Sequence, residues 1–178
     1  MSNNTEYELR VLEVDTTKLI EKLEKLGAKK IGEYNFRRHV FESVPPVSGR
    51  WVRLRSNGSE TTLTVKQIEN DEVDGTKEWE TRVDDFDEAL KILEKIGLSS
   101  KGYQENRRIE YELQGVQVCI DSWPKIPAYL EIEGKSKEEV LDTAMKLGFG
   151  KKDITGINTE KIYLKYGIDI SKKADLTF

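Results

Sequence analysis

Two residue types from which small proteins build covalent links and metal centres are almost missing from this chain of 178 residues. It has one cysteine, Cys119, and one histidine, His39. A single thiol cannot form an internal disulfide and excludes a multi-cysteine metal site, and a single imidazole excludes histidine-rich zinc and di-iron sites. A protein without disulfides suits a reducing compartment. We therefore expect a cytoplasmic protein in which His39 and Cys119 have packing or surface roles.

Long apolar runs are also absent. No stretch approaches the ~18 apolar residues of a membrane span, and the N-terminal letters MSNNTEYE lack both the basic and the apolar part of a signal peptide. Neither sign of charge is in large excess, with 29 Lys and Arg against 33 Asp and Glu and a net charge of −4. Because no strong positive field attracts phosphate backbones, we expect neither a nucleic acid nor a membrane as partner.

The length fits one domain, residues 1–178, with a core of its own. Apolar periodicity predicts three amphipathic helices, over 15–26, 85–96 and 136–147, each followed by a glycine. Between the helices the pattern changes to alternation of apolar and polar residues. This alternation predicts eight strands, over 5–14, 34–43, 51–56, 60–69, 76–83, 103–113, 116–122 and 128–134.

The chain also resembles itself. EYELRV at 6–11 and EWETRV at 78–83 are each followed by a helix that ends in EKLG or EKIG, and ten residues after each of these glycines comes a double arginine. The doublets, Arg37-Arg38 and Arg107-Arg108, are offset by 70 residues. We infer two related halves of about four strands each, which can close into a barrel without edges. Because side chains alternate along a strand, one arginine of each doublet should point outwards.

Most strands carry charge on one face and apolar residues on the other. Arg53 and Arg55 alternate with valine and leucine in WVRLR, and Glu131 and Glu133 alternate with leucine and isoleucine in YLEIE. The ordinary interpretation is an antiparallel sheet with one face in solvent. If the strands instead close and the helices cover the apolar outer faces, the charged faces point inward. Buried ions without partners are costly, so such an interior favours a highly charged ligand.

The grouping of these charges indicates which ligand. Carboxylates at positions i and i+2 of a strand face the same way, ~6.5–7 Å apart, and can bind Mg²⁺ or Mn²⁺, which prefer oxygen ligands. Guanidinium groups bind phosphate oxygens with two parallel hydrogen bonds, and lysine adds a point charge. Glutamate pairs and arginine pairs in one cavity therefore favour a polyphosphate with its divalent cation, and phosphoryl or nucleotidyl transfer as chemistry.

The ordered set of motifs EYELR, WVRLR, TLTVK, EWETR, RRIEYEL, CIDSW and YLEIE resembles the CYTH superfamily, the triphosphate tunnel metalloenzymes. This superfamily contains class IV adenylate cyclases, thiamine triphosphatases and inorganic triphosphatases. The resemblance covers nearly the whole chain. It implies an α+β fold, an eight-stranded antiparallel closed β-barrel (tunnel) with peripheral helices, which binds a triphosphate with Mg²⁺ or Mn²⁺.

The resemblance also carries the family's site residues onto this sequence. It implies catalytic and metal-binding roles for Glu6 and Glu8, and it puts Arg10 where the family's ExExK motif has a catalytic lysine. Arginine keeps the charge but cannot give up a proton. The further metal ligands that it implies are Glu80 (with Glu78 as the alternative), Asp121, Glu131 and Glu133. The phosphate-binding residues that it implies are Arg53, Arg55, Lys66, Arg108 and Lys161 (with Lys165 as the alternative). Arg82, the repeat partner of Arg10, either binds phosphate as well or neutralises Glu80.

We expect an enzyme that uses Mg²⁺ or Mn²⁺ to hydrolyse the terminal phosphate of a small triphosphate, such as tripolyphosphate, thiamine triphosphate or ATP. The alternative is a class IV adenylate cyclase, in which the ribose 3′-hydroxyl of ATP attacks the α-phosphate and releases pyrophosphate. Trp51 or Trp123 at a tunnel mouth could then contact the base. A second alternative is a non-catalytic binder of polyphosphate or nucleotide. The sequence leaves both a monomer and a homodimer open.

Overall fold

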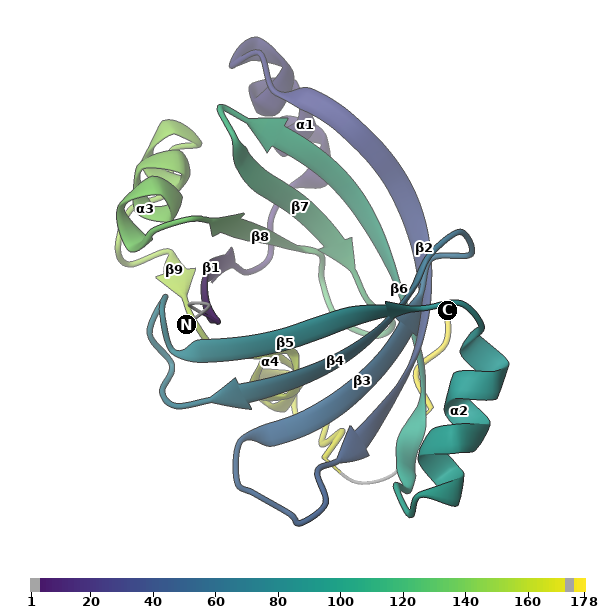
Figure 1. Cartoon of the computed structure of the whole chain (residues 1–178). Coiled ribbons are helices and arrows are strands. Elements are labelled where there is room, and N and C mark those ends of the chain that lie inside the picture. Colours follow the sequence, from purple (N-terminus) through teal and green to yellow (C-terminus); the bar gives the residue numbers. More distant parts are fainter. Residues whose placement is uncertain (1–3, 172–174) are drawn as a thin grey trace.

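The computed structural model describes residues 4–171 and 175–178 (Figure 1). The strands are β1 (Thr5–Val11), β2 (Lys29–Glu42), β3 (Arg50–Ser56), β4 (Thr61–Ile68), β5 (Thr76–Val83), β6 (Ser100–Leu113), β7 (Val116–Ser122), β8 (Tyr129–Gly134) and β9 (Ile154–Thr155). The helices are α1 (Thr16–Lys25), α2 (Phe86–Lys95), α3 (Lys137–Lys146) and α4 (Thr159–Lys165).

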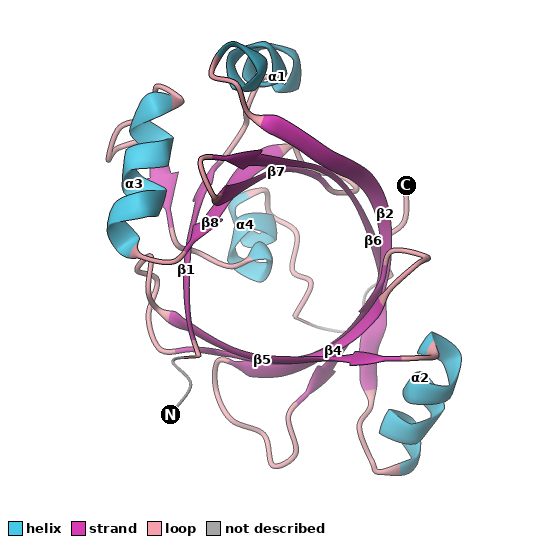
Figure 2. Ribbon diagram, turned by 45° about the horizontal axis from the view of Figure 1, so that its top comes forward, coloured by secondary structure: helices cyan, strands magenta, loops and turns pink. Residues whose placement is uncertain are grey.

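Eight of these strands form one closed antiparallel barrel, visible as a ring in Figure 2. Around the ring the order is β5-β4-β3-β2-β6-β7-β8-β1, and β1 pairs again with β5. This closing seam joins Thr5 and Glu6 of β1 to Lys77 and Thr76 of β5. The short β9 pairs with the end of β1 outside the ring. Closure leaves none of the eight strands with an open edge.

The strand pairing follows the sequence repeat. The two halves, β1-α1-β2-β3-β4 and β5-α2-β6-β7-β8, have the same order of elements. Their second strands, β2 and β6, pair with each other, and the first strand of each half pairs with the last strand of the other. The expected eight-stranded antiparallel barrel with peripheral helices, built from two related halves, is confirmed.

Helices cover the apolar outer faces of the barrel. Leu23 of α1 and Val140 of α3 are completely buried in one cluster with Leu9 and Ile132 of the strands beneath them. On another side of the barrel, a second cluster joins α2 to β2 and β3 through Phe86, Leu93, Phe41, Val52 and Leu54. With their apolar faces occupied in this way, the strands direct their charged faces into the barrel.

A third cluster lies where α4 and the C-terminal segment meet the barrel. Trp123, which follows β7, packs edge-on against Tyr163 of α4, with ring centroids 6.1 Å apart. The Tyr163 hydroxyl donates a hydrogen bond of 2.8 Å to the Pro124 carbonyl, and Ile170 and Leu176 complete the cluster. In Figure 2, α4 is seen through the ring of strands. The helix is thereby fixed against one end of the barrel.

The predicted helices are confirmed to within one residue at each end, but several other boundaries differ. The strand predicted over 5–14 ends at Val11, because Glu13 adopts a left-handed φ of 57°. β2 and β6 begin several residues earlier than predicted, and neither β9 nor the short α4 was predicted. Helix α4 begins where the Asn158 side chain accepts a hydrogen bond from the Lys161 N–H. No helix in the described residues is long and apolar enough to cross a membrane.

Candidate active site

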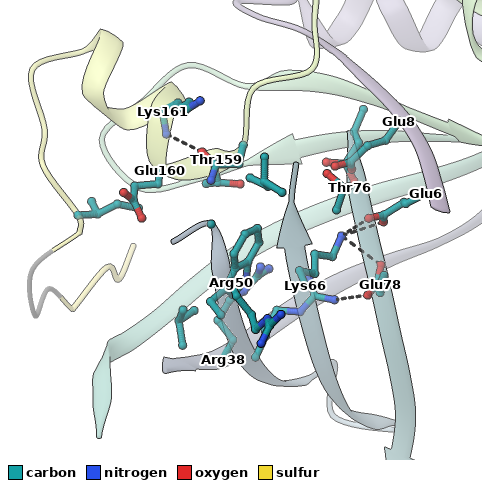
Figure 3. A pocket seen from close by; sticks show the side chains of 18 of the residues that line it. Glu6, Glu8, Arg38, Arg50, Lys66, Thr76, Glu78, Thr159, Glu160 and Lys161 are labelled. Atoms are coloured by element: carbon teal, nitrogen blue, oxygen red, sulfur yellow. Dashed lines mark hydrogen bonds and ion pairs between the residues drawn. The ribbon is translucent and has the colours of Figure 1, made fainter. Parts of the chain in front are cut away.

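The barrel encloses a cavity of about 1030 Å³. It is lined by the inward side chains of the strands and by residues of α4, some of which are drawn in Figure 3. Every site residue predicted from the sequence lines this cavity except Arg82 and Lys165, the alternative to Lys161. Closure of the sheet thus gathers residues from both halves of the chain around one space.

Two predicted metal ligands face each other across neighbouring strands. Glu8 of β1 and Glu133 of β8 are direct cross-strand partners, and like charges in such positions destabilise the sheet. Burial, reinforced by nearby Glu131 and Glu8 and opposed by Lys66, raises the pKa of Glu133 to about 7. Arg10 pairs with Glu8, so the negative charge that a proton or a further cation would neutralise is mainly that of Glu133.

Lys66 joins three strands at the seam of the barrel. Its Nζ donates to both carboxylate oxygens of Glu6, each at 2.8 Å, and lies 3.1 Å from Oε2 of Glu78 (Figure 3). Burial would lower the pKa of Lys66, but Glu8, Glu6 and Glu78 outweigh burial and raise it. The two acids that contact Lys66 differ in their pKa. Burial raises the pKa of Glu6, whereas Lys66 and Arg53 overcome the effect of burial on Glu78 and lower its pKa.

Of the two alternatives on β5, Glu78 lies deeper than Glu80. The Glu80 side chain is 36% exposed, against 20% for Glu78. Its Oε2 accepts a hydrogen bond of 2.7 Å from Thr64 and lies 3.3 Å from Arg53. Glu80 therefore balances an arginine near the rim, and Glu78 is the acid that reaches the lysine in the interior.

Glu131 is held between two arginines. Arg10 donates to its Oε2 from Nε at 2.9 Å, and Arg108 donates to its Oε1 at 2.7 Å. Arg108 also binds Asp121 through two hydrogen bonds of 2.9 and 2.6 Å. Both Glu131 and Asp121, predicted as metal ligands, are thus counter-ions of arginine in this structure.

Arg10 stands where the resemblance implies a lysine, and all three nitrogens of its guanidinium contact acceptors of the protein. Its Nη2 lies 2.7 Å from Glu8 and 2.7 Å from Glu131, and its Nη1 donates to the Ile157 carbonyl at 3.0 Å. Burial would lower the pKa of Arg10, but Glu8 and Glu131 overcome burial and raise it. Arg10 therefore fixes two of the acids and joins β1 to the segment before α4.

The opposite wall is basic. Arg53 of β3 lies 3.3 Å from Glu78, whereas the nearest ion-pair contact of Arg55 is Glu80 at 4.0 Å. Burial, together with the neighbouring Arg53 and Arg108, lowers the pKa of Arg55 to about 9. The Arg55 guanidinium also lies over the Phe36 ring, 4.7 Å from its centroid. The nearby carboxylates, Glu78 and Glu80, therefore do not fully neutralise the positive charge of this wall.

Three predictions concern the ends of the cavity. Lys161 of α4 lines it and is bound to Asp71 of the β4–β5 loop at 2.6 Å, whereas the alternative, Lys165, is not among the lining residues. Arg82 does not reach the cavity: its side chain is 77% exposed and pairs with Glu60 at 3.0 Å. It sits near the outer end of β5 opposite Thr62, so its repeat relation to Arg10 does not give it the same surroundings.

The structure adds lining residues to which the sequence analysis gave no role, among them Arg38, Arg50 and Gln104, and it also places Trp123, the predicted mouth residue, in the lining. The arginine doublets contained the signal for the first of these. Arg38 points inward, while Arg37 stacks outside on Phe86 at 4.2 Å from the ring centroid. His39 packs outside as well, 6.0 Å from the Phe86 ring, and Cys119 is a buried free thiol.

The acidic wall fits a divalent cation by its chemistry. Glu6, Glu8 and Glu133 supply carboxylate oxygens from two adjacent strands, the donor type that Mg²⁺ and Mn²⁺ prefer. The excess of acid between Glu8 and Glu133 is what a cation would relieve. Among the described residues, no group of three or more Asp, Glu, Cys or His side chains lies close enough together to coordinate a metal ion as they stand. Lys66 and Arg10 would have to share their carboxylates with the ion.

A family model for the CYTH domain matches residues 4–158. The chain belongs to the CYTH family. The PH1012 protein of Pyrococcus horikoshii OT3 has 26% sequence identity and a TM-score of 0.76 to this CYTH protein, over 86% of the present chain and 96% of that chain. Comparison with curated proteins finds no match.

Two more distant structures share the fold. A putative adenylate cyclase from Vibrio parahaemolyticus has a TM-score of 0.76 at 15% identity, covering 92% of this CYTH chain and 99% of its own. A putative adenylyl cyclase from Hippeastrum, described with a dominant triphosphatase activity, has a TM-score of 0.55 at 12% identity, covering 94% and 98%.

The clamp on Glu131 predicts a loss of stability when its charge is removed. In Glu131→Gln, Arg10 and Arg108 lose a shared buried counter-ion, so the free energy of unfolding should fall by about 3–5 kcal/mol. Urea denaturation measures this, with Glu112→Gln at the exposed end of β6 as the control. Equal stability of the two variants would mean that the clamp does not support the fold.

The raised pKa of Glu133 predicts a pH dependence of the metal-free protein. Between pH about 4.5 and 7 the folded state binds a proton that the unfolded state has lost, so stability should fall as pH rises. The fall should reach up to about 3 kcal/mol, since one pKa unit corresponds to about 1.4 kcal/mol. Urea denaturation at several pH values, compared with Glu133→Gln, isolates this contribution. A pH-independent difference between wild type and variant would contradict the assignment.

Proposed function

We propose that this CYTH protein is a Mg²⁺- or Mn²⁺-dependent enzyme that hydrolyses the terminal phosphate of a small triphosphate compound. The observation that carries the proposal is the presence of two unbalanced walls in one cavity. Glu8 and Glu133 form an excess of acid on β1 and β8, and Arg53 and Arg55 belong to an excess of base on β3. A triphosphate with its cation has the complementary charges of both walls.

The positions of the residues in the cavity support the following roles. Glu6, Glu8 and Glu133 would hold the cation, which supplies charge neutralisation on phosphate oxygens and acidifies water. Arg53 and Arg55 would bind the phosphate oxygens. A water molecule attacks the terminal phosphorus while the bond from that phosphorus to the bridging oxygen breaks, so the products are orthophosphate and the shortened diphosphate. Orientation and electrostatic stabilisation are the main contributions that such a reaction needs from a protein.

One feature favours the adenylate cyclase as the second candidate. Aromatic and apolar residues also line the cavity, among them Tyr129 and Ile170, which belong to one cluster, and Trp51 and Ile68. A base and ribose could contact these residues while the phosphates contact the arginines. The ribose 3′-hydroxyl would then attack the α-phosphate and expel pyrophosphate. Products distinguish the two reactions, because only the cyclase converts ATP to cyclic AMP.

The decisive assay supplies tripolyphosphate and ATP side by side with Mg²⁺ or Mn²⁺. We expect metal-dependent release of orthophosphate, and at least a hundredfold slower turnover in Glu8→Gln and in Glu133→Gln, since loss of metal ligands removes transition-state charge stabilisation. Glu88→Gln on exposed α2 is the control and should keep the wild-type rate. Cyclic AMP as product would replace the triphosphatase by the cyclase, and saturable binding with no product would leave only a binding protein.

Arg53 and Arg82 form a matched pair of variants, since one lines the cavity and the other lies on the surface. Arg53→Ala should weaken tripolyphosphate binding about tenfold or more, because it removes charge-assisted hydrogen bonds. Its effect on orthophosphate binding should be smaller, and Arg82→Ala should change neither. Calorimetric titration gives both affinities. Equal losses in Arg53→Ala and Arg82→Ala would show that Arg53 does not contact the phosphates.

A further inference from the structure

Arg38 is a buried arginine placed directly beside another arginine. It is 7% exposed, and in the β2–β3 ladder its cross-strand partner is Arg55. Both side chains line the cavity. Two like charges in direct cross-strand positions repel each other, the more so where little water screens them. The pair is therefore an unfavourable arrangement unless something negative lies between its members.

No carboxylate of the described residues forms an ion pair with Arg38. Its Nη2 donates to the side-chain oxygen of Asn106, an uncharged acceptor. Asp121, the carboxylate that this amide also contacts, accepts hydrogen bonds from Asn106 and Arg108. Burial, together with Arg53 and Arg55, lowers the pKa of Arg38 well below its usual value. Arg38 thus has two arginines as neighbours, and the acid near it, Asp121, accepts its hydrogen bonds from Arg108 and Asn106.

Unused hydrogen-bond donors gather at the same place. Within the described residues, the Nε of Arg38, the Nε of Arg53 and the indole Nε1 of Trp123 are buried and have no hydrogen-bond partner. The Arg38 guanidinium lies over the Trp123 ring, 4.5 Å from its centroid, and all three side chains line the cavity. Buried donors normally find an acceptor. Three free donors beside uncompensated positive charge call for a ligand rich in anionic oxygens.

This place is far from the acidic wall. Around the ring of eight strands, β2 is four strands away from β1 in either direction. Arg38 therefore faces Glu6 and Glu8 from across the barrel, and Figure 3 shows it apart from both. Its support comes from α4, because Tyr163 packs edge-on against Trp123.

We propose that Arg38, Arg55 and the indole N–H of Trp123 form an anion subsite that binds the substrate phosphate group farthest from Glu6, Glu8 and Glu133. The inference rests on the proposed function, since it assigns a further contact to the same triphosphate. It also gives Trp123 a role other than contact with a base: the indole supports the Arg38 guanidinium by cation–π stacking and donates its own hydrogen bond.

The test compares the two members of one arginine doublet, Arg38→Gln inside the barrel and Arg37→Gln outside it. Calorimetric titration with tripolyphosphate is done in EDTA, where turnover is excluded, and KM is measured separately with Mg²⁺. Arg38→Gln should weaken binding on the order of ten- to a hundredfold and raise KM accordingly, since charge-assisted hydrogen bonds are lost. Arg38→Lys should recover part of the loss, and Arg37→Gln should match the wild type.

Thermal stability distinguishes a ligand-binding role of Arg38 from a purely structural one. A structural role predicts that Arg38→Gln lowers the melting temperature of the ligand-free protein. If the arginine is present for the ligand, Arg38→Gln should melt at or above the wild-type temperature without ligand and gain less from added tripolyphosphate. Trp123→Phe, which keeps a ring but removes the N–H, should weaken binding a few-fold. A lower melting temperature together with unchanged affinity in Arg38→Gln would overturn the subsite.

The result also separates this inference from the proposed function. If the wild type hydrolyses tripolyphosphate but Arg38→Gln has the same affinity and KM as Arg37→Gln, the subsite is wrong and the triphosphatase stands. If the wild type neither binds nor hydrolyses tripolyphosphate, the proposed function fails and the subsite with it.

Discussion

Closure of the sheet is the constraint from which the rest of this structure follows. Helices cover the outer apolar faces, so the charged faces of eight strands share one cavity, in which each charge is partly removed from water. Most of these charges are stable only because they meet an opposite charge from another strand. Glu131 between Arg10 and Arg108, and Lys66 between Glu6 and Glu78, are the two centres of this compensation. The ion pairs thereby hold together strands that are distant in the sequence.

The charges in the cavity are not fully neutralised, and the sign of the remaining charge differs between the two walls. Glu8 and Glu133 leave an excess of acid on one side, and Arg38 and Arg55 leave an excess of base on the other. A cation alone would relieve the first excess and worsen the total positive charge of the cavity, and a polyphosphate alone would do the reverse. A ligand that brings both relieves both. Metal and phosphate should therefore bind with positive coupling, each lowering the cost of the other.

Alternation and the internal repeat were enough to predict the barrel, because both depend on local pattern and on spacing along the chain. Alternation and the repeat do not predict how far a side chain lies from the rim of the barrel. Glu78 and Glu80 share one face of β5, yet Glu78 reaches Lys66 and Glu80 remains near the rim. Arg82 continues the same face at the exposed end of the strand, where it pairs with Glu60. Depth depends on strand tilt and register around the whole ring, which no single segment encodes.

For a related reason, the sequence analysis left open which arginine of the Arg37-Arg38 doublet points inward. Alternation requires that one member point inward, but Arg37 is directed out by the position of Phe86 at the start of α2, a contact between separate elements. Arg10 shows the same dependence on distant partners. As arginine in place of the family's lysine, its planar fork contacts Glu8, Glu131 and the Ile157 carbonyl together. Its charge is neutralised by Glu8 and Glu131. Under the proposed function, contact with the substrate anion would therefore come from Arg38 and Arg55 on the opposite wall, whose charge is less neutralised.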